Sequence, residues 1–171
     1  MTEPAPPASV LKPVRVEPAS ILPREAWHGV LTETAIEVFS VMVGVNVTLA
    51  DGKTQGAKHV TGIVGIGGAI RANFILQCNR SAAVKLAAQM LGIDANTPDS
   101  QKAAFDALGE ICNIVAGYFK AKVGLGDACM LSVPTIITGQ DYRFHSSAYD
   151  RMELALIYEG EILSASLEVA Q

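Results

Sequence analysis

The feature that most constrains the fold is a strong helix pattern over residues 97–123. Thr97 has a side chain suited to a helix N-cap, Pro98 suits the first helical position, and Asp99 complements the helix dipole. Apolar residues then recur at helical spacing, at Leu108, Ile111, Cys112 and Val115. We therefore expect one helix from Thr97 to about Val123, the longest in the chain, with one apolar side.

The segments around this helix predict an α+β domain, with a mainly antiparallel sheet packed by long helices. Before it, the sequence predicts a helix at 24–42, strands at 44–51, 57–68 and 69–78, and a helix at 81–92. After it, strands are expected at 127–139, 141–147 and within 152–169. Turns are expected at Asp51-Gly52, Gly67-Gly68 and Glu159-Gly160. This order lacks the strict strand–helix alternation of a doubly wound fold.

The chain of 171 residues is long enough for one domain with a substantial core. Six of its eight prolines fall within the first 23 residues. Residues 1–19 therefore read as a Pro-rich N-terminal tail, and residues 20–171 as a single ordered domain.

Composition excludes several classes of function. A net charge of −4 without a basic run disfavours a non-specific nucleic-acid binder, because nothing could neutralise a row of phosphates. The longest weakly charged stretch, 61–78, contains four glycines and alternates in polarity, so no membrane insertion is expected. The N-terminus lacks the basic start and apolar run of a secretory signal. We expect a cytoplasmic protein.

The cysteines and histidines do not indicate a reactive or metal site. Cys78, Cys112 and Cys129 lie far apart among apolar residues, which predicts reduced, buried thiols. The three histidines are also scattered, with no pair at the spacing of helical ligands. No metal is therefore expected on this chain.

Other enzyme motifs are also missing. The glycines between 62 and 68 precede another strand pattern, whereas a phosphate-binding loop would need a following helix. No nucleophile-elbow sequence occurs. Asp106 and Glu110 could form a carboxylate pair, but one helical turn places their Cβ atoms only ~6 Å apart and nothing indicates a sugar cleft.

One row of the long helix admits two interpretations. Asp106, Glu110, Asn113 and Gly117 follow one another at intervals of four, three and four, so they share one face. This could be the ordinary wet side of an amphipathic helix. However, the two acids repel each other, Asn113 is a mediocre helix former, and interior glycines such as Gly109 cost about 1 kcal/mol each relative to alanine. A low, polar face of this kind also suits the close approach of another macromolecule.

A weak internal helix–strand duplication is visible between residues 33–51 and 106–130. Glu33 and Glu37 have the spacing of the two acids in the row, but Ser40 stands where the row has its asparagine. The first copy is therefore incomplete.

The stretch DALGEICNIVAGYFKAKV, followed by SVPTIITG, resembles the CheC/CheX/FliY family of chemotaxis phosphatases, and CheX-like members most closely. The likeness covers roughly residues 24–145. The signature of that family would fall on Asp106, Glu110, Asn113 and Pro134. Because the first copy is incomplete, the resemblance implies one active face per chain.

The resemblance implies that the chain hydrolyses the aspartyl phosphate of a CheY-like response regulator. Asn113 would orient the attacking water, Glu110 would pair with a lysine of the partner, and Asp106, Gly109 and Gly117 would contribute to the partner-binding face. The required Mg²⁺ would belong to the receiver, and the chain would form a homodimer. The alternative is a non-catalytic module of the same fold that binds a receiver or a flagellar-switch protein.

Overall fold

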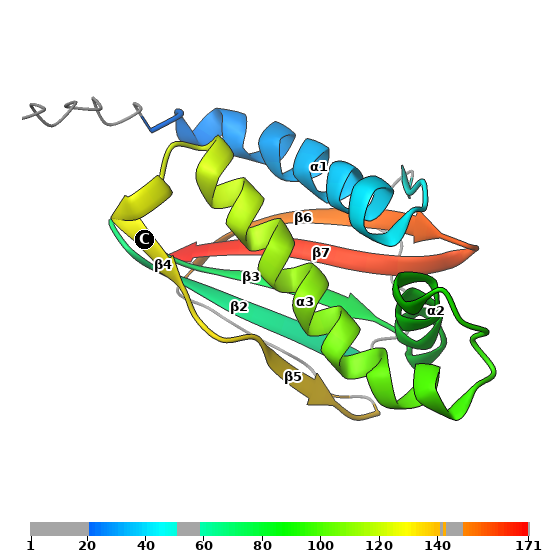
Figure 1. Cartoon of the computed structure of the whole chain (residues 1–171). Helices are drawn as coiled ribbons and strands as arrows, with labels where there is room; N and C mark the ends of the chain where they lie inside the picture. Colours follow the sequence, from blue (N-terminus) through cyan, green and yellow to red (C-terminus); the bar gives the residue numbers. More distant parts are fainter. Residues whose placement is uncertain (1–20, 51–58, 141, 143–148, 171) are drawn as a thin grey trace, which may run out of the picture.

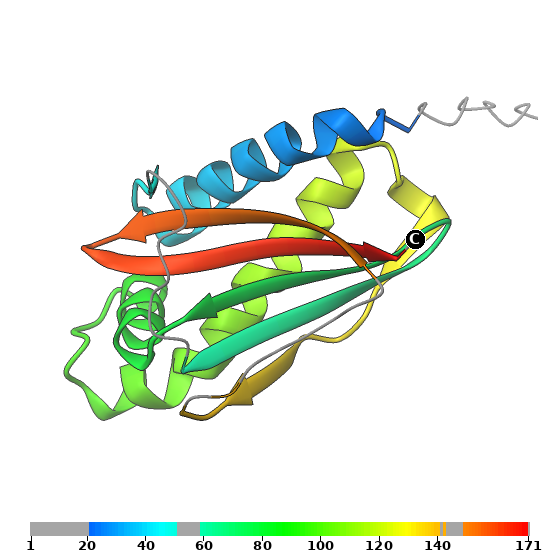
Figure 2. The same ribbon diagram turned by 180° about the vertical axis from the view of Figure 1, so that it is seen from behind.

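The computed structural model describes residues 21–50, 59–140, 142 and 149–170. The expected tail at 1–19, the Asp51-Gly52 turn and all but Tyr142 of the strand expected at 141–147 lie outside these residues. The described part is an antiparallel sheet with its helices on one face (Figure 1), and from behind no described helix covers the other face (Figure 2). This confirms the predicted α+β class.

The three predicted helices are all present, and their ends follow the expected capping chemistry. α1 (Trp27–Val38) is preceded by a 3₁₀ turn, Arg24–Ala26, and continues as a π-helix, Phe39–Val43. α2 spans Arg80–Leu91 and α3 spans Pro98–Lys122. Thr97 caps α3 as predicted, with its Oγ1 accepting a hydrogen bond from the Ser100 amide. A short 3₁₀ turn, Gly126–Ala128, follows α3.

In the described part of the chain, seven strands form one sheet around two central hairpins. The strands are β1 (Thr48–Leu49), β2 (Val60–Gly68), β3 (Arg71–Cys78), β4 (Cys129–Leu131), β5 (Thr135–Thr138), β6 (Tyr149–Tyr158) and β7 (Glu161–Ala170). Their order is β1-β6-β7-β3-β2-β4, and β5 also pairs with β2. The predicted Glu159-Gly160 turn joins β6 to β7, with both residues at positive φ.

This topology gives the internal duplication a structural form. Each half of the chain contributes a long helix, short edge strands and a two-stranded hairpin. The edge strands cross over between the halves: β1 of the first half pairs with β6, whereas β4 and β5 of the second half pair with β2. The two halves therefore close a single sheet together.

Two local expectations were wrong. The strand expected at 44–51 is reduced to Thr48–Leu49, because Gly44 adopts a left-handed conformation and ends the helical segment first. The turn expected at Gly67-Gly68 lies instead at residues 69–70, since both glycines still belong to β2. Gly68 allows β4 to approach closely, because a Cβ there would lie 2.3 Å from the Ala128 carbonyl oxygen.

The core fills the space between the helices and the sheet. Trp27 of α1 meets Phe119 of α3 edge to face, with 5.6 Å between ring centroids. The predicted burial of all three cysteines is confirmed, and none forms a disulfide. Burial raises the pKa of the Cys78 thiol to about 12. No helix in the described part of the chain is both long and apolar enough to span a membrane.

Candidate functional site

The polar row of α3 lies on the side of the helix that faces away from the sheet. Asp106 and Glu110 are exposed, while Asn113 and Gly117 are half-buried. Within the described part of the chain, the side chains of Asp106, Glu110 and Asn113 take part in no hydrogen bond or ion pair. Two carboxylates and an amide are therefore available on one face for contact with another molecule.

The opposite side of α3 holds this row in place. Leu108, Ile111 and Cys112 are fully buried, and Phe119 extends the same apolar side about two turns beyond Cys112. Cys112 lies against β2 at Gly62, where an added Cβ would be only 2.5 Å from its Sγ. Burial raises the pKa of the Cys112 thiol well above its ordinary range, so this residue serves packing and not chemistry. The exposed face is thus presented by a rigidly packed helix.

One flank of the row is bordered by the chain's own sheet edge. Gly109 is buried, and a Cβ there would lie 3.4 Å from Pro134 Cβ; at Gly117 the nearest atom is Leu131 Cδ1, at 3.7 Å. The missing side chains therefore let residues 131–134 lie close to α3. The sequence assigned both glycines to partner contact, which stays a prediction, whereas the observed contacts are internal.

The sequence pointed to Pro134 but not to the residues that position it. Between β4 and β5 the edge strand is interrupted, and Ser132 binds β2 at two points. Its amide donates to the Gly65 carbonyl at 2.8 Å, and its Oγ accepts from the Gly65 amide, also at 2.8 Å. The sequence signal for this contact was the glycines of β2 and α3, because several of them lie where residues 131–134 approach these two elements closely.

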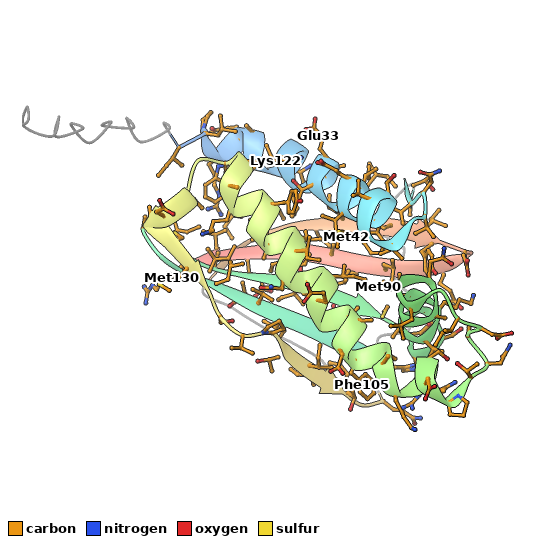
Figure 3. All side chains as sticks on the ribbon, viewed as in Figure 1. Glu33, Met42, Met90, Phe105, Lys122 and Met130 are labelled. Atoms are coloured by element: carbon orange, nitrogen blue, oxygen red, sulfur yellow. The ribbon has the colours of Figure 1, made fainter. Side chains whose placement is uncertain are left out.

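The incomplete first copy of the motif is differently placed. Glu33 is exposed on α1, but Glu37 forms an ion pair with Lys122 near the end of α3. Figure 3 shows Glu33 and Lys122 on the neighbouring helices. Ser40 lies in the π-helical turn and not in regular α-helix. The first copy therefore lacks both the asparagine and an unpaired second acid.

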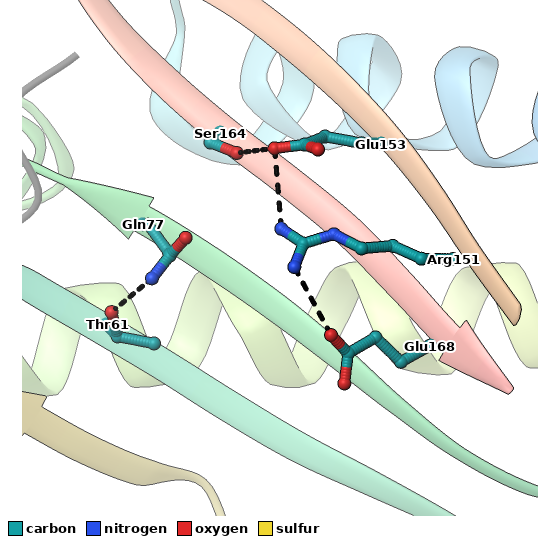
Figure 4. Close-up of polar contacts among 6 residues, drawn as sticks. All are labelled: Thr61, Gln77, Arg151, Glu153, Ser164 and Glu168. Atoms are coloured by element: carbon teal, nitrogen blue, oxygen red, sulfur yellow. Dashed lines mark hydrogen bonds and ion pairs between the residues drawn. The ribbon is translucent and has the colours of Figure 1, made fainter. Parts of the chain in front are cut away.

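The sheet face away from α3 carries a second group of polar side chains, which bind one another (Figure 4). Gln77 donates to Thr61 at 2.9 Å, and Arg151 bridges Glu153 and Glu168 at 3.3 Å each. These contacts pair groups that sheet formation partly removes from water. Among the described residues, no group of three or more His, Cys, Asp or Glu is arranged to hold a metal ion. The row on α3 therefore remains the candidate site.

Comparison with known proteins gives a consistent result. A family model described as "Chemotaxis phosphatase CheX" matches residues 60–154, which include the row on α3 and Pro134. No curated protein matches the chain by sequence.

Several solved structures have the same fold. The CheX in a CheX–CheY–BeF₃–Mg²⁺ complex from Borrelia burgdorferi is 18% identical, with a TM-score of 0.72 over 85% of this chain and 98% of that one. CheX from Vibrio vulnificus is 16% identical, with a TM-score of 0.70 over 84% and 98%. FliY from Thermotoga maritima is 15% identical, with a TM-score of 0.56 over 89% and 92%. At these identities the likeness establishes the fold.

Proposed function

The chain belongs to the CheX family of chemotaxis phosphatases, and we propose that it hydrolyses the aspartyl phosphate of a CheY-like response regulator. Family membership supports a role in chemotaxis, as a phosphatase or as a protein that binds CheY. The observation that favours catalysis is the pair Glu110 and Asn113, one turn apart on a firmly packed helix and without internal partners among the described residues.

In this proposal, Asn113 positions the attacking water. Its side-chain amide can both accept a hydrogen bond from water and donate one, and it carries no charge that would repel the phosphoryl group. Phosphoryl transfer requires little covalent assistance, so fixing a water in line with the phosphorus supplies much of the acceleration. The packing of Ile111 and Cys112 beneath Asn113 fixes the helix backbone, so the Cα of Asn113 is in place before the partner binds.

Glu110 acts as the anchor of the same surface. Its exposed carboxylate would pair with a lysine of the receiver and so fix the register between the two proteins. Asp106, one turn earlier, adds to the negative charge of this face and attracts a cationic partner surface. The Mg²⁺ would be held by the receiver.

The alternative function is a non-catalytic module that binds a receiver or a flagellar-switch protein. It is favoured by the similarity to FliY, and disfavoured by the intact Glu110–Asn113 pair. The two functions differ in one measurable property, the lifetime of the phosphate on the bound receiver.

We further propose that the protein is a cytoplasmic homodimer that pairs through the edge of its sheet. β6 is ten residues long, but β1 covers it only at Leu156 and Ile157, and Ala50 adds one further hydrogen bond at Ala155. The part from Asp150 to Leu154 has no neighbouring strand on that side among the described residues. An uncovered edge of this length can pair with a second copy. Light scattering of the purified chain tests this state.

The function is tested with CheY-like receivers of the source organism, phosphorylated by acetyl phosphate in the presence of Mg²⁺. We expect the protein to shorten the lifetime of the phosphate on one of them well below its spontaneous lifetime. Binding to beryllofluoride-loaded receivers is measured in parallel. Binding without a change in phosphate lifetime would establish the alternative, and the absence of both would reject the proposed function.

A further inference from the structure

The edge segment, residues 131–134, runs along the flank of α3 between Gly117 and Gly109, and so beside most of the polar row. Leu131 lies at Gly117 and Pro134 lies at Gly109, so the two ends of the segment are fixed eight residues apart along α3. Eight helical residues span about 12 Å, and three extended steps span about 10 Å. The segment therefore lies nearly parallel to α3, with its middle residues beside Glu110 and the following turn.

The segment does not alternate as a regular strand. Leu131 and Pro134 both contact α3, although residues three apart in a strand face opposite sides. The irregularity arises where Ser132 turns to bind Gly65 of β2. A bulge of this kind re-aims a side chain, and here it leaves Val133 outside the sheet.

Val133 is 83% exposed, the highest exposure of any large apolar residue in the described part of the chain. It lies in a stretch, residues 128–140, that contains no charged residue. The flank of the acidic row is thus an uncharged surface with one projecting apolar side chain. A partner that fits both features presents a cation to Glu110 and an apolar patch beside it.

A second copy of this chain fits the same flank poorly. Edge-to-edge pairing needs a continuous strand, but here β4 has three residues, β5 has four, and Pro134 between them lacks an amide donor. The opposite edge, formed by β6, is the long and regular one. The flank is therefore suited to a surface that rests on it and not to a strand that extends it.

We propose that Val133 is an apolar docking anchor for the receiver, contacting the surface beside its phosphorylated aspartate. This rests on the proposed function, because the occupant is the partner of the Glu110–Asn113 row. Val133 contributes to affinity and takes no part in the chemical step. It is the apolar complement of Glu110, and together they fix the position from which Asn113 reaches the phosphate.

The test is Val133→Ser, compared with the wild-type chain in binding and in turnover. Burial of a valine side chain is worth enough for its loss to weaken association by about tenfold. We expect the Kd for the beryllofluoride- and Mg²⁺-loaded receiver and the KM for the phosphorylated receiver to rise by that factor, while kcat stays within about twofold. Thermal unfolding monitored by circular dichroism verifies that the variant is folded.

Two matched variants serve as controls. Val41→Ser changes the same residue type at 71% exposure on the π-helix of the first half, and Met130→Ser removes a side chain of 77% exposure from β4. Met130 alternates with Cys129 and Leu131, which face α3, so it points to the other side of the sheet. Both variants should bind the receiver like the wild-type chain.

The outcomes separate this proposal from the proposed function. If the wild-type chain binds or dephosphorylates a receiver but Val133→Ser leaves Kd and KM unchanged, the anchor is rejected and the function stands. A loss confined to kcat, or a shift from dimer to monomer with an unchanged Kd for the receiver, also rejects it. If the wild-type chain engages none of the loaded receivers, both proposals fail together.

Discussion

The two long helices of the duplicated halves occupy comparable places, yet only one carries a complete polar row. In α3, Glu110 is followed by Asn113, whereas in α1 the matching Glu37 is followed by Ser40. The carboxylate of Glu37 is bound to Lys122, while Glu110 has no ionic partner among the described residues. The two halves therefore share an architecture, but the second acid of the row is free to bind a partner only in α3, among the described residues.

The residues that flank the row also differ between the two helices. Gly109 leaves room for Pro134 at the side of α3, but its counterpart in α1 is Ile36, which packs partly into the core. Gly117 lies inside α3, whereas its counterpart Gly44 ends the helical segment of the first half. The comparison indicates two requirements for a functional face. It needs its polar residues, and it needs an uninterrupted helix with glycines where the sheet edge packs against it.

The largest contrast between the halves is expected from charge reversal. Glu110→Lys places a cation against the lysine of the receiver, and like charges across an interface cost several kcal/mol. We expect kcat/KM for the phosphorylated receiver to fall by about 100-fold. The matched variant is Glu37→Lys, which should leave kcat/KM within about twofold. Equal losses in both variants would contradict the assignment of the active face to α3.

The next largest effect is expected when Gly109 of α3 is replaced by isoleucine, the residue found at the matching position, Ile36, of α1. In Gly109→Ile, the side chain meets Pro134 and Ile136, whose nearest atoms lie 3.4 and 3.7 Å from the position of its Cβ. Overpacking of this kind costs about 1–3 kcal/mol. We expect a lower free energy of unfolding in urea and weaker receiver binding, because the edge segment is displaced.

Gly109→Ala is the control for this substitution, because a single methyl reaches Pro134 only at ordinary contact distance. It should fold with at least wild-type stability. A fully active Gly109→Ile variant would show that the position of Pro134 is unimportant.

A smaller effect, of opposite sign, is expected from Gly117→Ala. The added methyl has room, since its nearest neighbour is Leu131 Cδ1 at 3.7 Å, and alanine is the better helix former. The free energy of unfolding should rise by about 0.5–1 kcal/mol, measured by urea denaturation. A loss of stability would mean that α3 requires the glycine for its own conformation. Weaker receiver binding by a stabilised variant would support the predicted partner contact of Gly117.

The smallest effect is expected from removing the ion pair between Glu37 and Lys122. Lys122→Ala removes the partner of Glu37, but both side chains are partly exposed, and such pairs contribute only about 0.2–1 kcal/mol. We expect little change in the melting temperature and none in phosphate lifetime. Dephosphorylation that depended on Lys122 would place part of the site at α1.

Much of the fold followed from local chemistry in the sequence. Thr97, Pro98 and Asp99 identified the start of α3, and the Glu159-Gly160 pair identified the hairpin turn between β6 and β7. These features can be predicted from the sequence because each depends on residues only a few positions apart. The turn predicted at Gly67-Gly68 was wrong, because Gly68 instead accommodates the backbone of Ala128 and Cys129, some sixty residues away along the chain.

The site was predictable in part for the same reason. Glu110 and Asn113 share a helical face, which their spacing alone predicts. That residues 131–134 border α3 was not predictable, because it depends on which strand forms the edge and on the bulge at Ser132. The ion pair of Glu37 with Lys122 joins two helices that are far apart in the sequence, so it was not predictable either.

The most direct test of the central claim is the decay of phosphate on a phosphorylated receiver with the wild-type chain or with Asn113→Ala. The account predicts that the variant folds normally and binds the beryllofluoride-loaded receiver with unchanged Kd, but slows the accelerated decay by about 100-fold or more. Wild-type acceleration by Asn113→Ala would contradict the account, because the row on α3 would then act without its asparagine.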